Sequence, residues 1–197
     1  MSSTQEMSTP RWSTTVADPA ALGLAGFAMT TFVLSLANAG FIAGAGAAVL
    51  GLALFYGGIA QLLAGMWEFV KGNTFGAVAF SSYGAFWLAF WWLLTNPAAE
   101  KAAGAAGVGA FLLAWTIFTA FMTIGAIKSS RVVLLVFIAL TLTFLLLTIG
   151  AFSGAETASH IGGYLGLVTA VLAWYGSAAS VINSTWKRTV LPVGAPS

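Results

Sequence analysis

Neutral hydroxyl and amide side chains are the groups in this sequence most suited to chemistry, and they lie within long apolar runs. They are Thr30, Thr31, Ser35, Asn38, Gln61, Ser81, Ser82, Tyr83, Thr116, Thr119, Thr141 and Thr143. Such groups can replace part of the hydration shell of a small polar solute without holding it tightly. The residues expected to hydrogen-bond a solute are Thr30, Thr31, Asn38 and Gln61. Alternatively, each group bonds to a neighbouring helix or to the preceding turn of its own helix.

Two titratable side chains, Glu68 and His160, are the candidates for proton linkage. Glu68 lies near the end of the second apolar run, and His160 lies at the start of the last one. Glu68 can alternatively extend to the membrane surface or cap a helix end, and His160 can be an ordinary interfacial histidine. A proton can also cross the membrane on the solute itself, which would require neither residue.

The composition excludes most other kinds of function. Charged residues make up 6% of the 197 residues and hydrophobic residues 59%, whereas a soluble domain is about 25% charged. Seven Lys and Arg side chains are too few for a nucleic-acid-binding patch. The sequence has no cysteine and a single histidine, so neither a metal site nor a cofactor is expected. The apolar runs contain no Ser/His/Asp spacing and no paired carboxylates, which argues against an enzyme.

These features indicate an all-α polytopic membrane protein with six transmembrane helices around a narrow pore in each subunit. A helix needs about 20 mostly apolar residues to cross the hydrocarbon of a bilayer. The expected spans are Leu22–Leu36, Ala47–Val70, Phe75–Leu94, Val108–Ile127, Val132–Phe152 and Ile161–Ile182. Residues 21–184 would form the transmembrane domain, between an N-terminal segment at 1–20 and a C-terminal tail at 185–197.

The positive charges predict how these spans are oriented. With six spans, the termini and the second and fourth loops share one side of the membrane. The cationic residues on that side are Arg11, Lys71, Lys128, Arg131, Lys187 and Arg188. The opposite side carries Lys101 alone. Because cytoplasmic loops are enriched in Lys and Arg, we expect both termini in the cytoplasm. Residues 1–12 are polar and lack a signal-peptide pattern.

Three bulky residues lie at a common depth in the first, third and fifth spans. Phe27, Tyr83 and Leu140 lie about seven to nine residues inside their spans, which is roughly 10–14 Å from the same side. Three such side chains at one level could close a narrow gate. The alternative is that they pack in the core, because periodicity alone does not show that they face a common axis.

Small residues form two faces suited to close helix packing. Gly162 and Gly166 make a GxxxG pattern, and Gly57 and Gly58 make a small face on the second span with Ala60 and Ala64. Such faces let helix backbones approach closely. They predict either packing within the chain or association of subunits into a homo-oligomer.

The tripeptide Asn96-Pro97-Ala98 resembles the NPA motif of water channels. A water channel needs two such motifs at the ends of half-helices that meet in the middle of the membrane. Here the tripeptide follows the third span, and a degraded partner at residues 18–20 precedes the first. Neither is flanked by a short apolar half-helix, so a water channel is excluded.

Longer motifs carry a resemblance to a known family. Residues 18–24 (DPAALGL) resemble the NPAPLGL signature of the acetate uptake transporter family, also called the GPR/FUN34/YaaH group. The stretches FYGGIAQ at 55–61, KGNTFG at 71–76, SYGAFW at 82–87 and RTVLP at 188–192 are similar to that family as well. Two residues depart from the signature, since Asp18 replaces its Asn and Ala21 its second Pro.

The resemblance implies a function and a site. Members of the family move acetate, and in some cases succinate, through six-helix subunits that assemble as a hexamer with one path per subunit. Their narrow gate is a Phe, a Tyr and a Leu, which match Phe27, Tyr83 and Leu140. We therefore expect channel-like or proton-linked transport of acetate and related small monocarboxylates across the inner membrane.

Two other functions fit the same sequence. A hexameric urea or amide channel also has six spans and an aromatic constriction, but its flux would not depend on an anion. A membrane receptor that does not transport would respond to its ligand without flux in liposomes. In each case the expected partners are a small solute, the lipid bilayer and further copies of the chain.

Overall fold

The computed structural model describes residues 16–194, and all of its regular secondary structure is helical. The elements are α1 (Ala20–Asn38), α2 (Ala45–Leu54), the π-helical turn η2 (Phe55–Ala60), α3 (Gln61–Lys71), α4 (Thr74–Thr95), α5 (Pro97–Ala126), α6 (Arg131–Ser153) and α7 (Glu156–Trp186). Because α2, η2 and α3 run on as one rod, the described chain has six helices long and apolar enough to cross a membrane. The six-span all-α prediction is confirmed.

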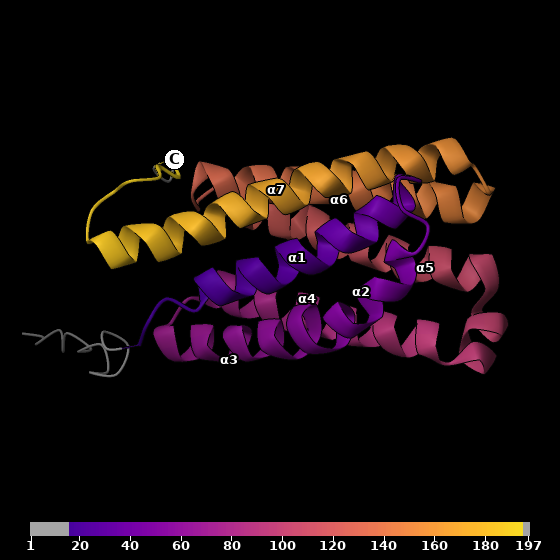
Figure 1. The fold of residues 1–197 in the computed structure, drawn as a ribbon, viewed down its shortest axis with the longest axis horizontal. Helices are drawn as coiled ribbons and strands as arrows, with labels where there is room; N and C mark the ends of the chain where they lie inside the picture. Colours follow the sequence, from indigo (N-terminus) through magenta and orange to yellow (C-terminus); the bar gives the residue numbers. More distant parts are fainter. Residues whose placement is uncertain (1–15, 195–197) are drawn as a thin grey trace, which may run out of the picture.

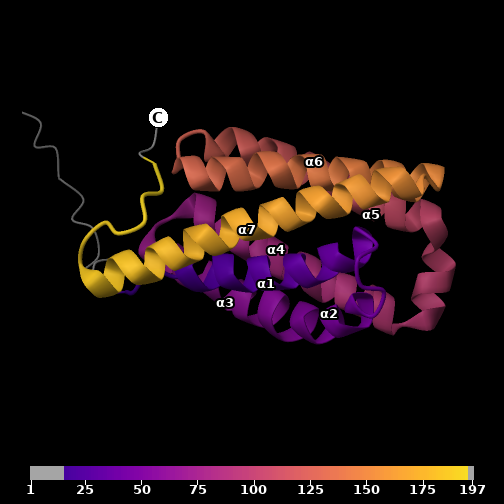
Figure 2. The same cartoon turned by 45° about the horizontal axis from the view of Figure 1, so that its top comes forward.

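The six spans contact one another in a closed ring, and Figures 1 and 2 show them running alongside one another. Helix α1 packs against α7, α7 against α6, α6 against α5 and α5 against α4. Helix α4 packs against α3, and η2 and α3 return to α1. The helices lie roughly along one long axis, and the described chain starts and finishes at the same end of the bundle (Figure 1).

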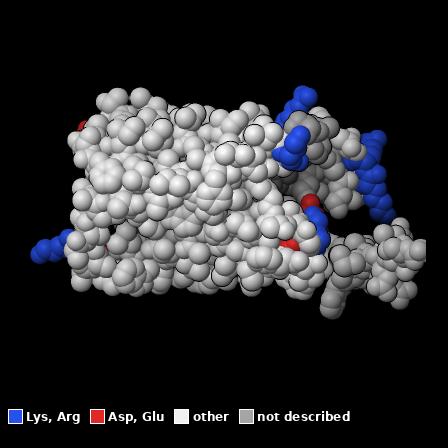
Figure 3. Space-filling view, turned by 180° about the vertical axis from the view of Figure 1, so that it is seen from behind, with Lys and Arg blue, Asp and Glu red and all other residues white. Residues whose placement is uncertain are grey.

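Cationic side chains gather at this same end (Figure 3). We call it the basic end, formed by residues 16–19, 71–73, 127–131 and 187–194. Its Lys and Arg residues within the described chain are Lys71, Lys128, Arg131, Lys187 and Arg188. The opposite end is formed by residues 39–44, 95–104 and 154–156, and Lys101 lies there. The charge asymmetry read from the sequence therefore corresponds to the two ends of one bundle.

The glycine faces are used for packing within the chain. A Cβ at Gly166 would collide with the Ser35 hydroxyl, and one at Gly163 would collide with the backbone of Ala39. Gly57 has the same relation to the side chain of Thr30. Small residues thus let α7 and η2 approach α1 closely, so intrachain packing, the first of the two predicted roles, accounts for them.

The π-helical turn η2 changes the face that the second span presents. It inserts one extra residue into the helix, and such turns are frequent at functional sites. The Tyr56 carbonyl packs so closely on α1 that a Cβ at Gly26 would lie 2.6 Å from it. Below the turn, Gln61 and Glu68 lie one above the other on the buried face of α3. The sequence analysis did not predict this turn.

Asparagine side chains cap the starts of α4 and α5. Asn73 Oδ1 accepts from the Gly76 N–H at the start of α4, at 3.2 Å. Asn96 caps α5 in the same way, accepting from the Ala99 N–H at 3.2 Å, and Pro97 takes the first helical position. The Asn-Pro-Ala tripeptide is therefore a helix start. Helix α5 begins earlier than expected and is broken at Gly104, whose φ is 55°.

The C-terminal segment 189–194 is bound to the bundle at the basic end. Tyr175 donates to the Pro192 carbonyl at 2.7 Å, and the Asn183 amide donates to the Leu191 carbonyl at 2.8 Å. The Val193 carbonyl accepts from the Val132 N–H in the first turn of α6, at 3.2 Å. The tail expected at 185–197 thus includes a docked strap that joins α7 to α6.

Candidate substrate path

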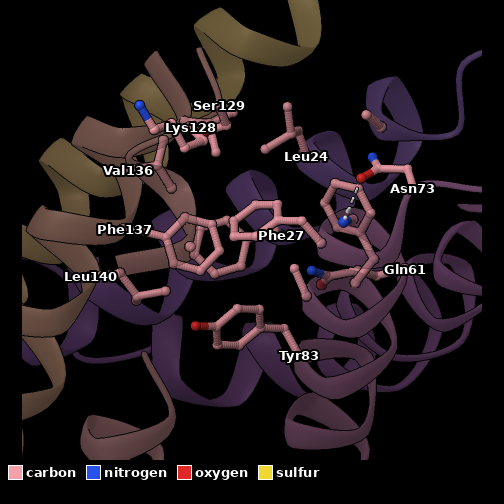
Figure 4. Close-up of a pocket in the computed structure, with 17 residues that line it drawn as sticks. Leu24, Phe27, Gln61, Asn73, Tyr83, Lys128, Ser129, Val136, Phe137 and Leu140 are labelled. Carbon is pink, nitrogen blue, oxygen red and sulfur yellow. Dashed lines mark hydrogen bonds between the residues drawn. The ribbon is translucent and has the colours of Figure 1, made fainter. Parts of the chain in front are cut away.

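A cavity of about 420 Å³ lies inside the ring of helices at the basic end. Residues of α1, α3, α4, α5 and α6 line it, and Asn73, Lys128 and Ser129 stand where it meets the surface (Figure 4). Most of the other lining residues are apolar, and Gln61 and Tyr83 are the polar ones deeper inside. The structure thus contains an apolar vestibule with polar groups at its mouth and in its depth.

Phe27, Tyr83 and Leu140 come together at the deep end of this vestibule (Figure 4). Their side chains are 5%, 3% and 4% exposed. The Phe27 and Tyr83 rings lie 5.8 Å apart between centroids. Each residue lies seven positions beyond another lining residue of the same helix, namely Ala20, Gly76 and Val133. The shared depth read from the sequence is therefore accompanied by a shared orientation.

The Tyr83 hydroxyl has a partner that the sequence analysis did not assign. Its oxygen lies 2.9 Å from Thr119 Oγ1, and Thr119 Oγ1 also donates to the Trp115 carbonyl at 2.7 Å. A threonine hydroxyl has a single proton, so in this arrangement Tyr83 donates to Thr119. The Tyr83 hydroxyl therefore already donates a hydrogen bond within the protein when no solute is bound.

Threonine spacing on α5 is the signal that could have revealed this bond. Thr116, Thr119 and Thr123 follow one another at three and four residues, which places them along one side of a helix. The Thr116 and Thr148 hydroxyl oxygens lie 3.1 Å apart, and the Thr123 and Thr141 hydroxyl oxygens lie 2.9 Å apart. For these residues the alternative reading of the hydroxyls, bonding between helices, describes the structure.

Gln61 is the predicted solute-binding residue that the structure places in the vestibule. It is 1% exposed, and its Oε1 has no hydrogen-bond partner among the described residues. An amide carries two N–H donors as well as the carbonyl oxygen. Gln61 lies in the first turn of α3, directly after η2, which points it towards Phe27 and Tyr83 (Figure 4).

The other three predicted solute-binding residues lie elsewhere on α1. Thr30 donates to the Gly26 carbonyl of its own helix at 2.8 Å, and Thr31 has a buried hydroxyl without a partner among residues 16–194. Neither lines the vestibule. Asn38 does not line the vestibule either. It lies eleven residues beyond Phe27 on α1, roughly 16 Å along the helix, at the opposite end.

Glu68 is fully buried, at 0% exposure. Its Oε2 accepts from the Asn73 amide at 2.9 Å, while its Oε1 has no partner in the described part of the chain. Because Asn73 lines the vestibule and caps α4, it connects Glu68 to both. Of the alternatives to proton linkage, extension of Glu68 to the membrane surface is not observed, because α4 and the Asn73 side chain cover it. His160, in contrast, is exposed at the opposite end, beside Gly40.

Asp18 ties three elements together at the basic end. Its carboxylate accepts from Lys71 Nζ at 2.7 Å, from the Ala20 N–H at 3.1 Å and from Ser180 at 3.0 Å. Partial burial raises the pKa of Asp18, but the bonds from Lys71, Ala20 and Ser180 outweigh burial and hold that pKa below its ordinary value. The departure from the family signature at this position therefore creates an ion pair.

The closed ring of apolar helices and its vestibule define a polytopic membrane protein of the channel and transporter class. The chain belongs to the GPR1/FUN34/yaaH family, whose sequence model matches residues 2–195. This membership confirms the resemblance that the motifs carry.

Individual relatives support the same conclusion. The succinate-acetate/proton symporter SatP of Escherichia coli (strain K12) is 45% identical over 183 residues, covering 92% of this chain and 97% of SatP. Acetate permease A of Emericella nidulans is 40% identical over 196 residues, covering 90% of this chain and 65% of the permease. The solved structure of the bacterial acetate channel SatP matches with a TM-score of 0.86 and 44% identity, covering 91% of this chain and 99% of that one.

Proposed function

We propose that this chain transports acetate and related small monocarboxylates, and succinate as well, across the inner membrane. The observation that carries the proposal is the vestibule that ends at Phe27, Tyr83 and Leu140 inside a closed ring of six spans. Relatives that match nearly the whole chain are a succinate-acetate/proton symporter and an acetate channel. Phe27, Tyr83 and Leu140 form the gate of the path in this proposal.

The chemistry of acetate suits these side chains. Its methyl group can slide between Phe27 and Leu140, which offer only apolar surface. Its carboxylate is very costly to place in an apolar environment without hydrogen bonds. The Gln61 amide can supply donors on the approach to the gate, and the Tyr83 hydroxyl can supply one at the gate after exchanging Thr119 for the carboxylate. The acid can also cross in its neutral form, which becomes more abundant as the pH falls towards about 4 to 4.5.

Glu68 is the better supported of the two candidates for proton linkage. It is buried and connected through Asn73 to the wall of the vestibule, and one of its oxygens is unpaired among the described residues. His160 is exposed at the opposite end. In the proposed mechanism Glu68 takes up a proton from the basic end, and the Asn73 amide positions the carboxyl group of Glu68.

The orientation and assembly belong to the same proposal. The excess of cations at the basic end supports placing that end, with both termini, in the cytoplasm. The hexamer that the family resemblance implies must use faces other than the glycine faces, because α1 occupies those within the chain. Native mass spectrometry in a mild detergent measures the number of subunits.

Uptake of radiolabelled acetate into proteoliposomes, with and without a pH gradient, tests the proposed function. We expect saturable uptake above that of protein-free liposomes. A response to the gradient that Glu68→Gln abolishes would favour proton linkage through Glu68, whereas a response that persists would identify passage of the neutral acid. Urea flux without acetate flux would instead identify a urea or amide channel. Acetate binding without any flux would identify a receptor.

A further inference from the structure

We propose that the vestibule is a binding site for medium-chain monocarboxylates of about eight carbons, held with the alkyl chain inward and the carboxylate at the mouth. Such a ligand is larger than the solutes assigned to the path. It would occupy the vestibule without passing the closed gate. The proposal uses the same cavity as the proposed transport function but does not depend on which solute crosses the membrane.

The volume of the vestibule exceeds what acetate needs. About 420 Å³ lies within the range of cavities that hold drug-sized ligands, roughly 300–1,000 Å³. Acetate has four non-hydrogen atoms and would leave most of this space to water. The space lies against apolar side chains, including Leu24, Phe75, Phe80 and Val136. An alkyl chain would remove this surface from water, which is favourable in proportion to the area covered.

The depth of the vestibule sets the length of the ligand. On α1, α4 and α6 the lining extends over seven positions, from Ala20, Gly76 and Val133 to the three gate residues. Seven helical residues span about 10 Å. An extended chain advances about 1.2 Å per single bond, as the reach of an extended polypeptide shows. An acid of about eight carbons therefore reaches from the mouth to the gate.

The polarity of the vestibule sets the direction of the ligand. Its deep end is closed by the apolar side chains of Phe27, Phe137 and Leu140 (Figure 4). Two polar residues, Gln61 and Tyr83, also line this end, and the Tyr83 hydroxyl is already bonded to Thr119. Lys128, Ser129 and Asn73 are the polar residues at the mouth of the vestibule, with Asn73 across the cavity from Lys128 and Ser129 (Figure 4). Among the described residues, the Asp18 carboxylate accepts from Lys71, and the Glu68 carboxylate accepts from the Asn73 amide. A lysine and two residues that can donate hydrogen bonds at the mouth suit an anionic head group better than a cationic one.

Binding of radiolabelled octanoate to the protein in nanodiscs, read by scintillation proximity and corrected with empty nanodiscs, tests this site directly. Competition by unlabelled acids should strengthen about fourfold for each CH₂ added from butanoate to octanoate and level off beyond. Octylamine should compete more weakly than octanoate. An affinity that keeps rising with chain length, as partition into lipid does, would overturn the proposal, and so would binding equal to that of empty nanodiscs.

Matched substitutions separate the vestibule from the outer surface. Val136→Phe fills the vestibule, whereas Leu135→Phe adds the same ring on the exposed side of α6. Ala79→Phe and Ala85→Phe form a second pair on α4, in case Val136→Phe does not fold. We expect the inner member of each pair to weaken octanoate binding at least about tenfold and the outer member less than about twofold. Equal binding within both pairs would refute the site.

A further pair of substitutions tests the position of the carboxylate head group. Lys128→Gln at the mouth should weaken octanoate binding about two- to fivefold, as expected for an ion pair at a surface. Lys101→Gln at the opposite end should leave it unchanged. Because none of these measurements uses acetate flux, failure of this proposal is distinguishable from failure of the proposed transport function.

Discussion

Tyr83 and Thr119 are joined by a 2.9 Å hydrogen bond between their hydroxyl oxygens, at the deep end of the vestibule. Thr119 in turn donates a hydrogen bond to the Trp115 carbonyl, so the two bonds form a chain that ends on the backbone of α5. The bond holds the Tyr83 ring against α5. The Tyr83 hydroxyl can donate to a solute only after it gives up its bond to Thr119. The bond also links α4 to α5, two neighbours that otherwise pack less extensively than other pairs in the ring.

Tyr83→Phe should slow acetate transport without broadening the range of solutes. The substitution removes the hydroxyl but keeps the ring that narrows the path. A hydrogen bond to a charged group is worth about 1.5–3 kcal/mol, so its loss at the barrier reduces the rate at least about tenfold. Initial rates of acetate and lactate uptake into proteoliposomes measure both effects. Thr119→Val is the matched control, because it removes the resting partner of Tyr83 and leaves the donor in place. Equal slowing by both variants would show that the hydroxyl only braces the helices.

Leu140→Ala should widen the gate and raise lactate transport relative to acetate. The change removes three carbons from a side chain that is 4% exposed at the deep end of the vestibule. Truncating a buried leucine costs about 2–5 kcal/mol of stability, so size-exclusion chromatography must first show that the variant is folded. Leu142→Ala, on the exposed side of the same helix, is the control. An unchanged lactate-to-acetate ratio in folded Leu140→Ala would place the size filter elsewhere.

Gln61→Leu should separate stability from transport. The substitution replaces an amide whose Oε1 is buried without a partner in the described structure. Removing an unsatisfied buried polar group is neutral or stabilising, so thermal unfolding should occur at the same temperature or higher. Acetate transport should fall at the same time, because the donors in the vestibule are lost. A fall in both stability and transport would identify Gln61 as a structural residue.

The ion pair of Asp18 should make stability depend on acid pH. Because the folded pKa of Asp18 is lowered, its contribution is fully present above its ordinary value of 3.8 and is lost as the pH falls through the folded pKa. Asp18→Asn should be less sensitive to pH in that range. At pH 7 the two proteins should differ by less than about 1 kcal/mol, since the pair is partly exposed. Thermal unfolding between pH 2.5 and 7 measures this. Parallel pH profiles for the two proteins would contradict the assignment.

A reporter fused after Ser197 should report a cytoplasmic location. The reason is the concentration of Lys and Arg at the basic end, which carries the C-terminal segment. Alkaline phosphatase, active only in the periplasm, and a fluorescent protein that matures in the cytoplasm give opposite signals at the same site. Phosphatase activity there would reverse the orientation, and with it the side from which the vestibule opens.

The sequence predicts well the helices and the common depth of Phe27, Tyr83 and Leu140, because both depend on position along a helix. Spans follow from runs of apolar residues, and the depth of Phe27, Tyr83 and Leu140 follows from the rise per residue. Direction around a helix is harder to read when apolar residues lie on all sides, as they do in these spans. Thr30 and Thr31 are neighbours in sequence within the same apolar run, and nothing in the pattern showed that neither lines the vestibule.

The turn η2, the burial of Glu68 and the partner of Tyr83 were not predicted, because they depend on contacts between helices. The turn η2 adds a residue to the second span, so the face below it cannot be followed from the face above by a period of 3.6. Glu68 is covered because Asn73 folds back over it and α4 passes close by at Gly76. The partner of Tyr83 lies 36 residues away on another helix. Each of these depends on which helices become neighbours, which the pattern within one helix does not contain.

The strap at 189–194 has a consequence for the order in which this protein matures. Its residues are synthesised after all six spans, yet the Val193 carbonyl accepts from the Val132 N–H in the first turn of α6. Until the strap arrives, that turn and the Tyr175 hydroxyl lack the partners they have in the finished structure. The first turn of α6, which contains the lining residue Val133, therefore gains its last hydrogen-bond partner only after all six spans have been synthesised.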